Sequence, residues 1–204
     1  MTKLDSRAGI AIGPILFIIA IMGALAAAFA ASSSGGFGTA GTSDRITNDV
    51  VGQANLIRSK IAECQLQYEV NGTNFASAPC ALDSYPCSDQ DDGTLVSALT
   101  CPNDPLVSAA QQSVWTGLRV TPYPQASKGM DEWMYINAGD AGGRCIWTAP
   151  TNGNHSGPIV EGLKRAAEKF SSSELLYDPN SESQKFVIII TPPTDTADSH
   201  CTVP

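Results

Sequence analysis

The longest apolar run in the chain extends from Ala8 to Ala31 and contains no charged residue. As a helix, its 24 residues would span about 36 Å, which exceeds the roughly 30 Å thickness of a bilayer hydrocarbon core. Lys3 and Arg7 precede it, and positive charge on this side favours an N-terminus inside and a C-terminus outside. Pro14 lies near the start of the run, so the helix either begins around this residue or is kinked by it.

A flexible linker and then an amphipathic helix are predicted after the apolar run. Residues 32–42 are rich in glycine and serine, which disfavour a helix and are typical of a flexible joint. Thr42 or Ser43 is a suitable N-cap, with Asp44 at the positive end of the helix dipole, and the Asn-Gly pair at 71–72 ends the helix. Apolar positions recur every three or four residues and form one stripe: Ile46, Val50, Ala54, Ile57, Ile61, Cys64 and Tyr68. Polar residues are expected mainly off this stripe: Arg45, Asn48, Asp49, Asn55, Arg58, Lys60 and Glu63.

The remainder of the chain predicts a small β-sheet domain. Residues 71–112 have an irregular pattern, and residues 158–170 predict a one-sided helix that begins at a proline. The AGDAGG segment is a plausible hairpin loop, and the tail after residue 190 is expected to be a loop pinned by Cys201. Residues 43–204 are thus expected to form an α+β domain, with the amphipathic helix packed on a small antiparallel β-sheet. Short apolar or aromatic runs predict four strands, the last of them central: Val114–Val120, Glu132–Asn137, Arg144–Thr148 and Lys185–Ile190.

Charge and cysteine content narrow the class of protein. The chain has a net charge of -8, and an acidic surface repels phosphate backbones, so we expect no nucleic-acid partner. All of the cysteines follow the apolar run, and their even number predicts disulfides in an oxidising compartment. Six cysteines allow 15 pairings, among which the sequence does not choose. The disulfide candidates are Cys64, Cys80, Cys87, Cys101, Cys145 and Cys201.

The sequence offers little that is typical of an enzyme. His155 and His200 lack the spacing of a metal site, and the glycine-rich and serine motifs of nucleotide-binding proteins and hydrolases are absent. The acidic turn Asp89–Gly93 departs from calcium-loop spacing, so a solvated turn is expected. We therefore expect no catalytic residue, metal or cofactor. Three tryptophans could form a sugar-binding platform, but their strand positions favour the core: Trp115, Trp133 and Trp147.

The order of these segments resembles that of a type IV pilin or pseudopilin. The similarity rests on Arg7-Ala8-Gly9 followed by Ile10, then on the apolar run, the amphipathic stripe and the strands through Ile190. It implies a leader of residues 1–9, cleaved between Gly9 and Ile10, and an assembly helix over residues 10–31. Pro14 occupies the fifth position after this cleavage point, where the family usually has a glutamate. The small residues of the helix suit close helix contacts. The assembly-helix candidates are Ile10, Pro14, Phe17, Ile21, Gly23 and Ala27.

The resemblance implies a structural subunit of a type IV pilus-like or pseudopilus filament. Such a subunit self-associates, depends on assembly machinery, and resides in the inner membrane before it joins an extracellular or periplasmic filament. Two other interpretations stay open. The chain could be a single-span membrane-anchored ectodomain with a binding or structural role, including a membrane-associated virion protein. It could also be a secreted domain, because Ala28-Phe29-Ala30 matches a signal-peptidase site.

Overall fold

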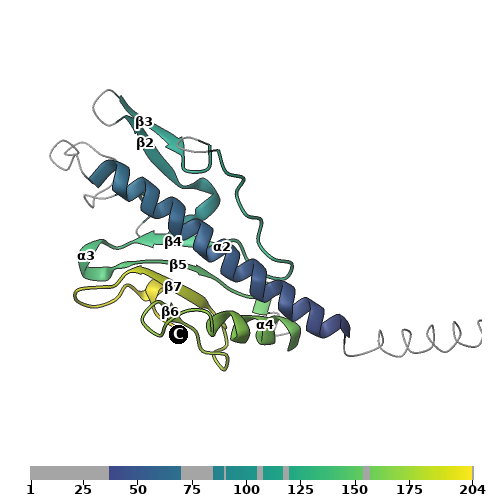
Figure 1. Ribbon diagram of the computed structural model, residues 1–204. Coiled ribbons are helices and arrows are strands. Elements are labelled where there is room, and N and C mark those ends of the chain that lie inside the picture. Colours follow the sequence, from purple (N-terminus) through teal and green to yellow (C-terminus); the bar gives the residue numbers. More distant parts are fainter. Residues whose placement is uncertain are drawn as a thin grey trace, which may run out of the picture. The chain divides into compact units, whose positions relative to one another are not determined.

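The computed structural model describes residues 37–69, 85–89, 91–104, 108–116, 120–153 and 157–203 (Figure 1). Residues Thr42–Pro204 form one compact unit, to which the following description applies. The leader, the cleavage point Gly9–Ile10 and the predicted assembly helix over residues 10–31 lie outside the described residues. Within the described ranges, none of the helices combines the length and the apolar character that crossing a membrane requires.

The domain has an α+β fold. Its helices are α2 (Phe37–Glu69), η1 (Val96–Ala98), α3 (Gly139–Gly142), η2 (Thr151–Gly153), α4 (Gly157–Ala167) and η3 (Ser199–Cys201). Its strands are β1 (Thr94–Leu95), β2 (Thr100–Asp104), β3 (Ser108–Ser113), β4 (Met134–Asn137), β5 (Arg144–Thr148), β6 (Leu175–Leu176) and β7 (Phe186–Thr191). They form an antiparallel five-stranded sheet, in the order β1-β4-β5-β7-β6, and a separate hairpin of β2 and β3.

Helix α2 carries the predicted apolar stripe. Six of the seven stripe residues, from Ile46 to Cys64, are at most 3% exposed, which confirms them as core. The side chain of Tyr68 lies outside the described residues. One polar residue was predicted wrongly: Lys60 is buried, and its Nζ atom lies 3.0 Å from Oε2 of Glu63.

The predicted start of this helix was also wrong. The helix begins at Phe37, so residues 37–42 are helical rather than part of a flexible linker, and neither Thr42 nor Ser43 is its N-cap. Extending an existing helix adds one hydrogen bond per residue without a new nucleation step. This gain offsets the low helix propensity of residues such as Gly41, whose surroundings are open.

The central hairpin of the sheet was predicted correctly. Strands β4 and β5 pair antiparallel, and α3 lies within their connecting loop. At the end of this loop Gly143 has φ +80°, a conformation that favours glycine. Strand β7 is paired on both sides, which confirms its interior position, although β6 on its far side was missed. Strand β6 has only two residues, which are too few to give a sequence pattern.

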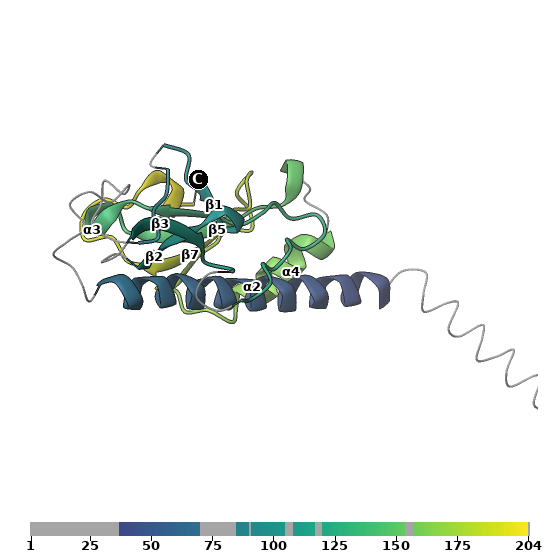
Figure 2. The same ribbon diagram turned by 90° about the horizontal axis from the view of Figure 1, so that it is seen from above.

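Alternation along the strands gives the sheet two buried faces. Tyr135, Ile146 and Ile188 are register partners that share one core with the stripe of α2 and with α4. Figure 2 shows α2 running along this face of the sheet. The intervening residues Cys145 and Val187 belong to a second cluster that includes Cys201 of the C-terminal tail. Thus α2 covers one face, and the tail packs on the other.

Two predictions for the segment before β4 were wrong. Residues 71–112 were expected to be irregular, but residues 100–104 and 108–112 lie in the β2–β3 hairpin, whose strands have too few apolar residues to show alternation. Residues 114–120 were expected to form a strand, but 114–116 form a turn. The apolar residues Val114 and Trp115 are buried in this turn instead of in a strand. The Trp115 indole Nε1–H donates to the carbonyl of Val96 at 2.8 Å.

Candidate functional site

Helix α2 is attached to the rest of the described domain by a series of polar and covalent contacts. The first of these lie where α2 crosses α4. The hydroxyl of Ser43 donates to the carbonyl of Pro158, and that of Thr47 donates to the carbonyl of Gly162, each at 3.0 Å. Gly162 permits this approach, because a Cβ atom there would lie 2.9 Å from Ile46. Side-chain hydroxyls and a missing side chain therefore bring the two helices into direct contact.

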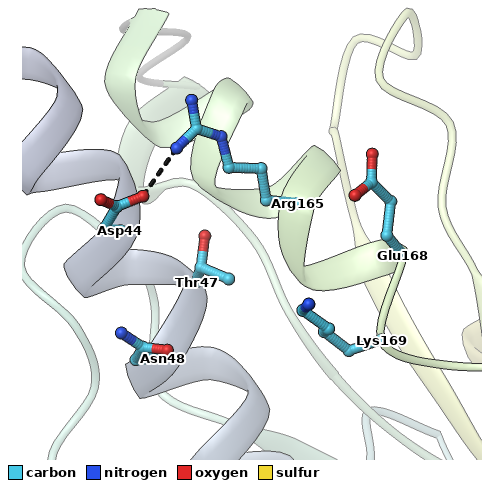
Figure 3. Close-up of a pocket in the computed structure, with 6 residues that line it drawn as sticks. All are labelled: Asp44, Thr47, Asn48, Arg165, Glu168 and Lys169. Atoms are coloured by element: carbon cyan, nitrogen blue, oxygen red, sulfur yellow. Dashed lines mark hydrogen bonds and ion pairs between the residues drawn. The ribbon is translucent and has the colours of Figure 1, made fainter.

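A polar groove of about 330 Å³ lies beside this crossing (Figure 3). Arg165 spans its rim, with Nη1 2.6 Å from Asp44 Oδ1 and Nε 2.9 Å from Glu161 Oε1. The hydrogen bond that Arg165 donates to Glu161, and then the one it donates to Asp44, raise the pKa of Arg165. Charges of both signs line the groove, which suits contact with a polar surface. The lining residues are Asp44, Thr47, Asn48, Arg165, Glu168 and Lys169.

A buried amide fixes the middle of α2. Gln53 accepts a hydrogen bond at 2.8 Å from the Trp133 indole Nε1–H, and its own Nε2 donates to the carbonyl of Gln125 at 2.7 Å. Gln53 lies three residues after Val50 and four before Ile57, so it is on the apolar stripe. This polar side chain at a stripe position is a signal that the sequence reasoning missed.

The second half of α2 is held by an ion pair and a disulfide. Arg58 Nη2 lies 2.8 Å from Glu174 Oε1, next to β6. Hydrogen bonds from Arg58, and then from Ser171, lower the pKa of Glu174 to about 2. Cys64 is bonded to Cys101 of β2, which confirms the expectation that this cysteine ties the helix to the domain.

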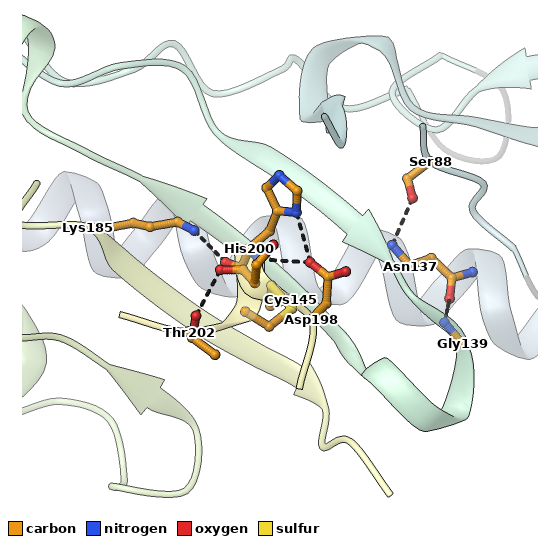
Figure 4. The surroundings of a disulfide bond; sticks show 10 residues. Ser88, Asn137, Gly139, Cys145, Lys185, Asp198, His200 and Thr202 are labelled. Atoms are coloured by element: carbon orange, nitrogen blue, oxygen red, sulfur yellow. Dashed lines mark hydrogen bonds and ion pairs between the residues drawn. A yellow bond between two sulfur atoms is a disulfide. The ribbon is translucent and has the colours of Figure 1, made fainter. Parts of the chain in front are cut away.

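On the opposite face of the sheet, a second disulfide holds the C-terminal tail. Cys145 of β5 is bonded to Cys201, which confirms that this residue pins the tail (Figure 4). Lys185 Nζ donates to the carbonyl of His200 at 2.5 Å and lies 4.7 Å from the centre of the Trp147 ring. Burial lowers the pKa of Lys185. The Trp147 and His200 rings stack with their centres 5.2 Å apart, so Trp147 contacts both Lys185 and His200.

The tryptophans and histidines singled out in the sequence differ in how far they are buried. Trp115 and Trp133 are buried in the core, as expected, whereas Trp147 is only partly buried on the tail side. His200 is partly buried, and its Nδ1 lies 2.8 Å from Asp198 Oδ1. His155 lies outside the described residues.

Cys87 is also disulfide-bonded, while Cys80 lies outside the described residues. In the acidic turn, Asp89 Oδ1 accepts the main-chain N–H of Asp91 at 2.9 Å. No cluster of three or more histidine, cysteine or acidic residues suited to a metal is found within the described ranges.

Comparisons with protein-family models, with curated protein sequences and with solved structures find no match to this chain.

Proposed function

We propose that the chain is a structural subunit of a type IV pilus-like or pseudopilus filament, assembled through its N-terminal apolar helix, residues 10–31. Other copies of the chain are its partners in the filament, and assembly machinery inserts it. It resides in the inner membrane before assembly and in an extracellular or periplasmic filament afterwards. The segment order described for the sequence, from the leader to the last strand, is the first support for this proposal.

The single observation that carries the proposal is the way α2 is fastened along its length. The contacts run from Ser43 at the α4 crossing, through Gln53 and Arg58, to the disulfide of Cys64. At 1.5 Å per residue, this interval covers about 32 Å of helix. A filament subunit transmits force between its assembly helix and its outer domain. Contacts distributed along α2 share this force, so the domain does not separate from the helix at one end.

The N-terminal residue of the mature protein tests the proposal. Intact-mass and peptide mass spectrometry of the native protein should identify an N-terminus at or next to Ile10, because the filament interpretation requires leader cleavage after Gly9. A retained Met1 would instead support a single-span membrane-anchored ectodomain, and an N-terminus near Ala31 would support a secreted domain. Either of these results would overturn the filament proposal.

A further inference from the structure

The end of the domain at α4, next to the polar groove, carries lysines that form no contact with a described side chain. Lys169 lines the groove and Lys164 precedes Arg165 in α4, and both are exposed. In Figure 3 the ammonium of Lys169 points towards α2, while the carboxylate of Glu168 points away from Lys169. Arg165 is already paired with Asp44 and a second carboxylate. This α4 end therefore offers two free ammonium groups beside one free carboxylate, that of Glu168.

A second end of the domain, at α3, carries exposed carboxylates. Asn137 immediately precedes the α3 turn, and its N–H donates to the hydroxyl of Ser88 at 2.8 Å. The N–H of Asp195 donates to the carbonyl of Ala141 in α3 at 3.2 Å. The turn before β1 and the tail after β7 thus both lie next to α3. Within the described residues, no ion pair involves the exposed carboxylates of this α3 end: Asp89, Asp91, Asp92, Asp140 and Asp195.

The two ends lie apart along the direction of α2. Figures 1 and 2 both show α4 beside the first part of α2 and α3 at the opposite end of the sheet. The free lysines of one copy are therefore not placed to neutralise the aspartates of the same copy. Like charges that lie close together repel each other, and a cation from another molecule would relieve this repulsion.

We propose that the α4 end of one copy binds the α3 end of the next copy. The free lysines of the first copy pair with Asp140 and Asp195 of the second. These aspartates lie on neighbouring segments, since the N–H of Thr194 donates to the carbonyl of Asp140 at 2.9 Å. The contact rests on the filament proposal and joins the outer domains of successive subunits.

The arrangement of charges also gives this contact a direction. Two different surfaces meet, so the contact is heterologous, and its repetition produces an open row of copies instead of a closed dimer. The reversed arrangement, with two α3 ends facing each other, would bring the aspartates of both copies together. Such like-charge contacts suppress the wrong orientation. A directional row of outer domains is compatible with a filament in which every subunit has the same environment.

Carbodiimide cross-linking of isolated native filaments tests this contact. The reagent joins an amine and a carboxylate that are already in contact, through an amide bond without a spacer. We expect a ladder of covalent multimers on a denaturing gel. Mass spectrometry of the dimer band should identify peptides that join Lys164 or Lys169 to Asp140 or Asp195. The ladder should weaken several-fold as the salt concentration rises, because salt screens exposed charges.

Charge reversal in the full chain supplies the matched variants. Lys164→Glu combined with Lys169→Glu should abolish the ladder, because carboxylates then face the aspartates. Adding Asp140→Lys and Asp195→Lys should restore it, since this swap returns opposite charges to the contact. Lys128→Glu is the control, because it makes the same change at an exposed lysine that does not line the groove, and it should leave the ladder unchanged. A cooperative thermal melt shows that each variant folds.

The outcomes separate this contact from the filament proposal on which it rests. Native filaments whose dimer band lacks the linked peptides, or a reversed variant that keeps its ladder, would overturn the contact and leave the filament proposal standing. A folded swap variant without a ladder would also overturn the contact, as would α4 lysines that are linked to a different protein. A native preparation without filaments would overturn both proposals.

Discussion

The close crossing of α2 and α4 predicts that Gly162→Ala destabilises the domain. A Cβ atom on Gly162 would lie 2.9 Å from the Cβ and Cγ2 atoms of Ile46 and from the main-chain oxygen of Ser43. Ile46 is 3% exposed and the Ser43 oxygen belongs to the helix backbone, so neither atom group can turn aside. The two helices must therefore separate by several tenths of an ångström to admit one methyl group.

The change in the free energy of unfolding caused by Gly162→Ala is the sum of effects of opposite sign. Replacing glycine by alanine inside a helix contributes about 1 kcal/mol of helix propensity. Against this, overpacking costs about 1–3 kcal/mol. Separation of the helices also weakens the hydrogen bonds from Ser43 and Thr47, each of which is worth about 1 kcal/mol. The losses exceed the gain, so the free energy of unfolding should fall by about 2 kcal/mol.

Urea denaturation followed by tryptophan fluorescence measures this change. Gly52→Ala is the matched control, because it makes the same substitution within α2 at a position where nothing lies within 4 Å of the new Cβ atom. The control should raise the free energy of unfolding by up to about 1 kcal/mol. If Gly162→Ala proved as stabilising as Gly52→Ala, the helix crossing would be looser than described and the reasoning would be refuted.

Three further predictions concern the attachment of α2. Gln53→Ala should lower the free energy of unfolding by about 2 kcal/mol, because it leaves a buried indole N–H without an acceptor. Asn55→Ala, on the exposed side of the same helix, should leave the melting temperature nearly unchanged, and equal losses would contradict this role. Replacing Cys64 and its partner by serine should cost about 4 kcal/mol from chain entropy for a sequence separation of 37, and an unchanged urea midpoint would contradict it. Arg58→Met should lower the stability at neutral pH. The depressed pKa of Glu174 stabilises the fold above its unfolded pKa of about 4.3, and this contribution disappears as pH falls towards about 2. The wild-type and variant midpoints should therefore converge across this acidic window, and a constant difference would count against the ion pair.

The sequence predicts the parts of this fold in which burial follows a regular period. The stripe of α2 has a helical period over 19 residues, from Ile46 to Cys64, and this pattern is sufficient because one face of the helix is buried and the other is not. Strands β4 and β5 are buried on both faces, and their apolar and aromatic residues on either side of a glycine-rich loop predicted them instead. Cys64 lies on the buried face of the α2 stripe, which is why its position correctly predicted a link between the helix and the domain.

The remaining features depend on contacts that no local pattern records. Strand β3 consists of small and amide residues, so no apolar face records its pairing with β2. The approach of Gly162 to Ile46 joins residues that lie more than one hundred positions apart in the sequence. The helical start at Phe37 reflects cooperative extension, which outweighs the glycine content of that segment.

Electron microscopy of the native protein isolated from its membranes tests the filament account most directly. The account predicts regular helical filaments, with the helices of residues 10–31 packed around the axis and the domains of residues 43–204 on the outside. Small residues such as Gly23 and Ala27 should lie at the contacts between these helices. A preparation that contains only dispersed single copies, in membranes or detergent and with no filaments, would contradict it.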